Sequence, residues 1–334
     1  MSTVALSRAY QAAREHSGLV SRNRGFIVVS GRDRASYLQG LLTNDITALT
    51  AGQGCYTAYL TAQGRMITDL FVYELGDIML LALPLATTAT VLGRLDQFIF
   101  SEDVQLADAT GTFGAVAVVG PDAADVLSRA VGADRAELGA MPLHASRRLE
   151  LGAIPLILLR SADTGESGFE VVLPQASLAD LMQKLRACGA ADVDDATADV
   201  LRIEAGVPRF GIDMDEHTIP LEAGIEQQAI SFTKGCYVGQ EVIIRVLHRG
   251  HGRVARKLVG LVCEAAPAAP APGTALHAGT SEIGMVTSSA ISPRVGRPVA
   301  LGYVKRDFAE PGATVTTSAG VVADVVALPF LPRS

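Results

Sequence analysis

The chain has 334 residues, of which 49% are hydrophobic and 5% aromatic, and its formal net charge at pH 7 is −7. This length provides for about two domains, each with its own core. The acidic balance argues against bulk nucleic-acid binding, which depends on clustered Lys and Arg. No stretch reaches the roughly 18 uninterrupted apolar residues that a membrane-spanning helix needs, so we expect no membrane contact.

Residues 1–20 predict an amphipathic helix, because Arg8, Arg14 and Glu15 interrupt its alanines. The segment lacks the apolar core and cleavage site of a secretory signal. A mitochondrial transit peptide is the less favoured alternative, and we expect a cytoplasmic protein.

The chain contains four widely separated cysteines: Cys55, Cys188, Cys236 and Cys263. The absence of a Cys-x-x-Cys pair argues against a disulfide framework. It also argues against a zinc or iron–sulfur site built from neighbouring ligands. We therefore expect no resident metal.

Two segments share a layout of apolar strand, glycine turn with an aspartate, and helix. They are residues 26–33 leading into 35–42, and residues 116–122 leading into 123–130. Neither turn carries Gly-x-Gly-x-x-Gly, which argues against a dinucleotide site. Further strands are expected at 55–60, 66–73, 78–83, 153–159 and 169–173, and a helix at 177–188. Strands and helices alternate, so this part is predicted to be α+β.

The run Lys234-Gly235-Cys236-Tyr237-Val238-Gly239-Gln240-Glu241 surrounds one cysteine with two glycines and a lysine. Apolar residues recur at every fourth position from Val238, which predicts a helix just after Cys236. The positive helix end and the Lys234 ammonium would both favour a thiolate. Cys236 is therefore the candidate nucleophile and Lys234 its activator; the alternative is a buried, unreactive cysteine.

From residue 256 onward the pattern changes to short valine-rich strands separated by Gly and Pro turns, which predicts a small β-barrel. Strands are expected at 257–263, 284–288, 299–305, 314–317 and 321–326. The proline-rich run 265–272 is expected to be a loop inside this barrel, because the first strand needs partners downstream.

The run from Lys234 to Glu241 closely resembles the signature of the YgfZ-type folate-binding proteins of the glycine-cleavage T-protein (aminomethyltransferase-like) superfamily. Residues 38–49, 201–223 and 257–304 also contain stretches similar to that superfamily. The resemblance implies a GcvT-like α+β fold of two intertwined α/β subdomains over residues 1–250. It implies a small C-terminal β-barrel over 251–334, and tetrahydrofolate or a one-carbon derivative as cofactor.

Within this resemblance, Glu204 is the residue expected to recognise the pterin, whose two adjacent N–H donors match one carboxylate. The other residues expected to bind the cofactor are Arg202, Thr43, Asn44, Asp45, Tyr237, Gln240 and Arg245. The acidic turn at Asp213, Asp215 and Glu216 is expected to be a solvated loop.

A basic run follows the predicted helix: Arg245, His248, Arg249, His251, Arg253, Arg256 and Lys257. Its cations could complement the helix dipole at a solvated helix end. The alternative is a grip for the glutamate tail of a folate or for an acidic partner.

One stretch departs from the aminomethyltransferases, which carry two consecutive aspartates there, the first being the catalytic carboxylate. Here the first position is Thr68, and only Asp69 remains. A threonine holds no negative charge at neutral pH and does not stabilise a developing cation as a carboxylate does. The resemblance implies that Asp69 faces elsewhere.

Together these features favour a folate-dependent accessory factor for assembly or repair of iron–sulfur clusters in client enzymes, a tRNA-modifying enzyme among them. Folate would bind at Glu204, while Cys236 contacts the cluster or the client. Two alternatives stay open. One is a tetrahydrofolate-dependent aminomethyl- or methyltransferase that uses Asp69 or Thr68 in place of the missing acid. The other is a non-catalytic folate-binding scaffold.

Overall fold

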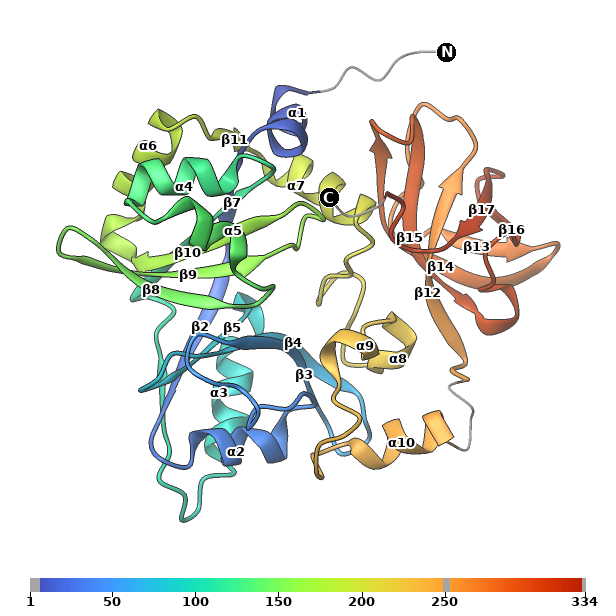
Figure 1. Cartoon of the computed structure of the whole chain (residues 1–334). Helices are drawn as coiled ribbons and strands as arrows, with labels where there is room; N and C mark the ends of the chain where they lie inside the picture. Colours follow the sequence, from blue (N-terminus) through green and yellow to red (C-terminus); the bar gives the residue numbers. More distant parts are fainter. Residues whose placement is uncertain (1–6, 249–252, 332–334) are drawn as a thin grey trace.

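The computed structural model describes residues 7–248 and 253–331, which form two mixed α/β subdomains and a barrel (Figure 1). The predicted fold class is confirmed. The predicted domain boundary at residue 250 lies outside the described residues. Among those residues, no helix is long and apolar enough to cross a membrane.

The first subdomain is built on a six-stranded sheet. Its strand order is β11 (Ala191–Val193), β1 (Gly18–Arg22), β7 (Phe113–Val119), β10 (Gly168–Pro174), β9 (Ile154–Ser161) and β8 (Ser146–Leu151). On one face lie α4 (Ala123–Val131), α5 (Arg135–Ala140) and α6 (Leu178–Ala187). On the other lie α1 (Arg8–Glu15) and α7 (Asp195–Glu204). Because helices cover both faces, β7 is apolar along nearly its whole length.

The second subdomain is built on a five-stranded sheet. Its strand order is β3 (Gly54–Leu60), β4 (Met66–Glu74), β5 (Met79–Pro84), β2 (Arg24–Ser30) and β6 (Gln105–Asp108). The helices α2 (Arg34–Leu41) and α3 (Thr88–Asp96) cover one face. Apolar residues of the other face pack against the first sheet. Strand β1 passes directly into β2 at Asn23, so the chain crosses between the two sheets there and the subdomains are intertwined.

Both predicted strand–turn–helix segments are present, as β2 with α2 and as β7 with α4. Gly31 has a φ of 100°, and a Cβ there would lie 1.9 Å from the carbonyl oxygen of Asp103. Only glycine fits this turn, because a side chain would both clash and strain the backbone.

A linking segment carries α8 (Pro220–Ala223), α9 (Glu226–Ala229) and α10 (Gln240–His248), and its apolar residues pack against β3 and β4. It leads into a closed barrel. The barrel order is β12 (Arg256–Cys263), β15 (Arg297–Lys305), β14 (Ser281–Ser292), β13 (Ala275–Ala278), β16 (Thr314–Thr317) and β17 (Val322–Val326). Residues 265–272 form a loop within the barrel, as expected. The prediction missed β13, which is only four residues long.

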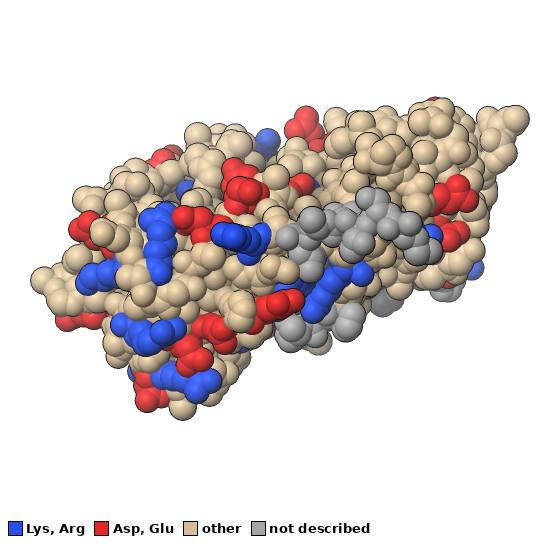
Figure 2. All heavy atoms as spheres, turned by 90° about the horizontal axis from the view of Figure 1, so that it is seen from above, with Lys and Arg blue, Asp and Glu red and all other residues tan. Residues whose placement is uncertain are grey.

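Acidic and basic side chains are interspersed on the face shown in Figure 2. Several exposed arginines form an ion pair with an acidic neighbour, as Arg148 does with Asp77 and Arg186 with Asp192. Exposed pairs of this kind contribute little to stability.

Candidate functional site

A cavity of about 880 Å³ lies between the two subdomains, the linking segment and the barrel. Its wall combines apolar and polar residues, and the polar side chains from both sheets and their loops include Arg22, Arg24, Tyr56, Asp69, His144 and Asp163. A cavity of this size, in which apolar residues and convergent polar groups line one wall, is typical of a small-molecule site.

Two arginines enter this wall at the crossing from β1 to β2. The Arg24 guanidinium donates to Asp163 Oδ2 at 2.7 Å and to Glu170 Oε2 at 2.9 Å. Arg22 lies 3.5 and 3.7 Å from the same two oxygens. Burial alone would raise the pKa of Asp163, but Arg22 and Arg24 hold it below its ordinary value. The cluster is therefore a set of buried charges that neutralise one another.

Strand alternation decides which of Thr68 and Asp69 faces the cavity. Thr68 is fully buried, and its hydroxyl lies 3.1 Å from that of Thr87. Asp69 has the opposite orientation on β4 and lines the cavity. The expectation that Asp69 faces elsewhere was therefore wrong.

The Asp69 carboxylate is held by a neighbouring strand. The hydroxyl of Tyr56, on β3, donates to Asp69 Oδ2 at 2.7 Å. Burial raises the pKa of Asp69, and the Tyr56 hydrogen bond offsets part of that rise. A partly desolvated, oriented carboxylate of this kind is typical of a functional site.

Phe71 continues the same face of β4, two residues after Asp69. Its ring centroid lies 5.1 Å from that of Tyr56 and 5.3 Å from that of His144. The guanidinium carbon of Arg24 lies 5.2 Å from the Phe71 centroid. Phe71 therefore lies in contact with Tyr56, His144 and Arg24 and holds the three side chains close together.

Three buried polar atoms at or directly behind this wall have neither a hydrogen-bond nor an ion-pair partner within the described residues. Thr164 Oγ1 and His144 Nδ1 belong to lining residues, and Glu170 Oε1 belongs to the carboxylate that pairs with Arg24. Leaving a buried polar group unpaired costs about 1–3 kcal/mol, so a cluster of them calls for an explanation. A polar ligand in the cavity would supply one.

Glu204, the predicted pterin residue, is fully buried and does not line this cavity. Its Oε2 accepts hydrogen bonds from the Tyr10 hydroxyl at 2.7 Å and from Arg14, and its Oε1 accepts one from Ser292. Both oxygens are therefore occupied by protein donors that tie α7 to α1 and to the barrel.

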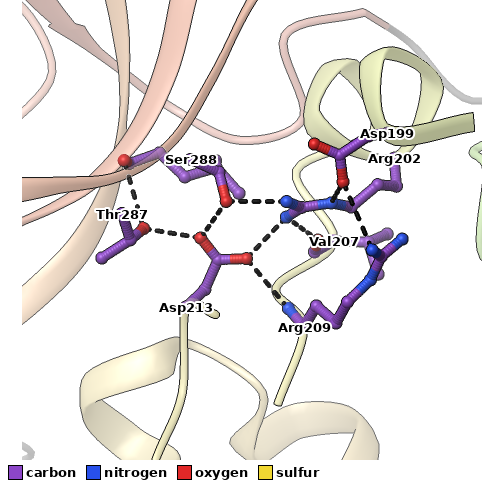
Figure 3. Close-up of polar contacts among 8 residues, drawn as sticks. Asp199, Arg202, Val207, Arg209, Asp213, Thr287 and Ser288 are labelled. Atoms are coloured by element: carbon purple, nitrogen blue, oxygen red, sulfur yellow. Dashed lines mark hydrogen bonds and ion pairs between the residues drawn. The ribbon is translucent and has the colours of Figure 1, made fainter. Parts of the chain in front are cut away.

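Arg202, on the same helix, lines the cavity, but its guanidinium N–H groups donate to other residues of the protein (Figure 3). It donates to Asp199 at 2.7 Å, to Asp213 at 2.5 Å and to Ser288 at 2.7 Å. Asp213 also accepts from the hydroxyls of Thr287 and Ser288, each at 2.6 Å. Asp213 is thus a buried link from α7 to the barrel, not the solvated residue expected, whereas Asp215 and Glu216 are exposed.

The predicted residues Thr43, Asn44 and Asp45 lie together with Lys234, and none of the four lines the cavity. Lys234 Nζ donates to the carbonyl oxygens of Gln39, Leu42 and Asn44 at 2.7–2.8 Å and so caps the end of α2. Burial lowers the pKa of Lys234 to about 8.

The side chains of this triplet are also bound to the protein. The buried Thr43 hydroxyl donates to the carbonyl of Ala229 at 2.6 Å. The Asn44 amide donates to the carbonyls of Tyr56 and Gln228 at 2.8 and 3.0 Å. Asp45 accepts from Gln39 and Thr47. These contacts join α2 to the linking segment.

Cys236 is exposed, four residues before α10 begins. The Lys234 ammonium points to backbone carbonyls, and no contact among the described residues joins it to the thiol. Tyr237 is buried in the core of the linking segment, Gln240 opens α10 and Arg245 is exposed. None of these four predicted residues lines the cavity. Part of the basic run, residues 249–252, lies outside the described residues.

Five residues of this charged wall and the layer behind it were not predicted from the sequence: Arg22, Arg24, His144, Asp163 and Glu170. One signal was available, since Glu170 stands inside the apolar run 169–173 and an acid in a buried strand is rarely unpaired. Its partners lie about 146 positions earlier in the chain, at the strand crossing.

Comparison with known proteins gives a consistent result over nearly the whole chain. The GCVT N-terminal domain family matches residues 3–234, and the glycine cleavage T-protein C-terminal barrel domain matches residues 256–331. The chain is 31% identical over 325 residues to a protein of Rubrobacter xylanophilus named aminomethyltransferase, covering 97% of this chain and 86% of that one. A Nostoc protein of the same name is 32% identical, covering 92% and 82%.

Among solved structures, the chain is similar to the glycine cleavage system aminomethyltransferase T from Bartonella henselae. The TM-score is 0.87 at 26% identity, and the match covers 99% of this chain and 90% of that one. Relatives of this name contradict the prediction of an iron–sulfur accessory factor and favour an enzyme. The YgfZ-type subgroup and the iron–sulfur partners are not supported by these matches.

Proposed function

This chain belongs to the glycine cleavage T-protein family, and on that premise we propose that it is a tetrahydrofolate-dependent aminomethyltransferase. In this reaction the aminomethyl carbon leaves both its carrier protein and its nitrogen and is bonded to two nitrogens of tetrahydrofolate. The two protons that those nitrogens lose go to the amine, which leaves as ammonia, and to the carrier atom that held the carbon. The observation that carries the proposal is the Tyr56–Asp69 pair in the wall of the large cavity. The missing first aspartate at Thr68 is no obstacle, because that position faces away from the cavity.

The cavity fits a folate in size and chemistry. Its volume of about 880 Å³ is in the range of cofactor sites. Glu170 Oε1, which has no hydrogen-bond partner among the described residues, belongs to the carboxylate that accepts from Arg24 of this wall, and it could accept from a pterin N–H donor. Glu170 therefore takes the role first expected of Glu204, whose oxygens are already occupied. Bound tetrahydrofolate would supply the nucleophilic nitrogens that accept the carbon.

Asp69 is the residue we assign to charge stabilisation. A carboxylate fixed in a cavity of low dielectric stabilises a developing cation more strongly than it would in water. The Tyr56 hydroxyl fixes one of its oxygens and so limits its rotation. Phe71 packs against Tyr56, and the carboxylate is half-buried in the cavity wall, which lowers the local dielectric around it.

The test is a turnover assay with the purified chain, an aminomethylated carrier protein and tetrahydrofolate, with ammonia release as the readout. We expect release that requires both the carrier and the folate. Glu170→Gln should weaken tetrahydrofolate binding, whereas Cys236→Ser should leave both binding and turnover unchanged. Absence of turnover, under conditions in which an aminomethyltransferase of known activity works on the same carrier, would refute the proposal.

A further inference from the structure

His144 has an unusual backbone conformation for its residue type. Within residues 7–248 and 253–331, it is the one non-glycine residue with a positive φ, at 64°. This left-handed conformation costs a residue with a Cβ about 1–2 kcal/mol. The neighbouring backbone holds it in place, since its N–H donates to the carbonyl of Arg160 at 3.1 Å. Strain of this kind is concentrated at functional sites.

The His144 ring lies in the same cavity wall as the proposed catalytic carboxylate. It lines the cavity, and its centroid is 5.3 Å from that of Phe71 at an interplanar angle of 48°. Phe71 and Asp69 point from the same face of β4. Asp163, from the loop between β9 and β10, is the nearby acid, and Arg24 from β2 covers the Phe71 ring.

The protein leaves one nitrogen of the His144 ring without a hydrogen bond. His144 Nδ1 is buried without a hydrogen-bond partner among the described residues. Burial lowers the pKa of His144, and Asp163 opposes this only in part. A neutral imidazole carries one donor and one acceptor. A phenylalanine would pack against Phe71 equally well without an unpaired nitrogen, so packing alone does not account for a histidine here.

We infer that His144 is a folate-contacting residue, whose imidazole hydrogen-bonds the pterin ring in the cavity. The inference rests on the proposed function, because it takes the folate as the occupant. The pterin edge presents N–H donors as well as ring-nitrogen and carbonyl acceptors. It can therefore pair with His144 Nδ1 whether that nitrogen is the donor or the acceptor of the neutral imidazole. His144 thereby discriminates a pterin from an apolar aromatic ring of the same size, whose binding would leave the imidazole unpaired.

The direct test is NMR of the full chain labelled with 15N in its six histidines, titrated with tetrahydrofolate. The His144 imidazole signals are assigned by their loss in His144→Phe. We expect these signals to move as the folate site saturates, while those of His277 in the barrel stay fixed. Saturable folate binding with unmoved His144 signals would overturn this inference alone. Absence of saturable folate binding would overturn the proposed function together with it.

Two variants separate the hydrogen bond from packing. His144→Phe keeps a ring against Phe71 but removes both nitrogens, and should weaken tetrahydrofolate binding about tenfold. The loss should be equal for tetrahydropterin, which lacks the tail. His144→Asn keeps a polar nitrogen in a residue that tolerates the left-handed backbone, and should lose less affinity. His277→Phe is the matched control. Equal affinities for wild type and a folded His144→Phe would overturn the inference.

Discussion

Replacing Asp69 by asparagine removes the charge of the proposed catalytic group while keeping its shape. The asparagine oxygen still accepts the 2.7 Å hydrogen bond from Tyr56, so the geometry of the wall should survive. A charge pair about 4 Å apart is worth about 4 kcal/mol at an effective dielectric of about 20. Loss of that term from the transition state should lower kcat about 1,000-fold.

Asp69→Asn should lower kcat but should not lower the stability of the folded protein. Burial raises the pKa of Asp69 in the folded state, so the folded protein binds a proton more readily than the unfolded chain does. The ionised acid therefore costs stability at all pH values above its unfolded pKa. Asp69→Asn removes that cost, and its melting temperature at pH 7 should equal or exceed that of the wild type.

The assay is ammonia release from the aminomethylated carrier under single-turnover conditions, with a thermal melt of each variant. Thr68→Val is the matched control, because it alters the adjacent residue that faces away from the cavity. Its kcat should remain near that of the wild type. If Asp69→Asn kept its kcat within about fivefold, a difference of only about 1 kcal/mol, the carboxylate would not be the stabilising group.

Four further predictions concern residues outside the cavity wall or its proposed chemistry. Asp213→Asn should lower the free energy of unfolding by about 1–3 kcal/mol in urea denaturation, because Arg202 loses its fully buried acid and keeps only the half-exposed Asp199. Glu204→Gln should destabilise the protein similarly yet leave the Kd for tetrahydrofolate unchanged; a selective loss of folate affinity would restore Glu204 as the pterin residue. Cys236→Ser should keep kcat within about twofold, because the side chain is exposed and does not line the cavity, and a larger loss would show that the thiol acts. Lys234 has a pKa of about 8 in the folded state and an ordinary value of 10.5 in the unfolded chain, so between about pH 8 and 10 the unfolded chain binds more protons and the free energy of unfolding should rise with pH. Lys234→Met should reduce this slope in pH-dependent denaturation. An unchanged slope would argue against a buried ammonium.

The parts of the fold that local sequence determines could be predicted. Gly31 and Gly120 sit at turns with φ of 100° and 108°, and both stand between an apolar strand and a helix, as the pattern indicated. The barrel followed from alternating valines and turn residues. Strand β13 was missed because four residues containing His277 show too little alternation, and pairing with β14 and β16 defines it.

The site was harder to predict because its charges meet across long sequence separations. Glu204 matched the expected chemistry, but Arg14 lies 190 positions earlier and occupies its carboxylate. Lys234 precedes the cysteine by only two residues, yet it reaches the end of α2 instead. Which side of β4 faces a cavity also depends on the tertiary packing of both sheets. Residue type thus indicated candidates, and only the fold showed which ones converge.

The fate of the transferred carbon tests the central claim most directly. The chain would be mixed with tetrahydrofolate and a carrier protein whose aminomethyl carbon is 13C-labelled, and the label followed by NMR. The account predicts that the label moves from the carrier to the folate with the wild-type chain and stays on the carrier with Asp69→Asn. Label that stays on the carrier with the wild-type chain, although tetrahydrofolate is bound, would contradict it.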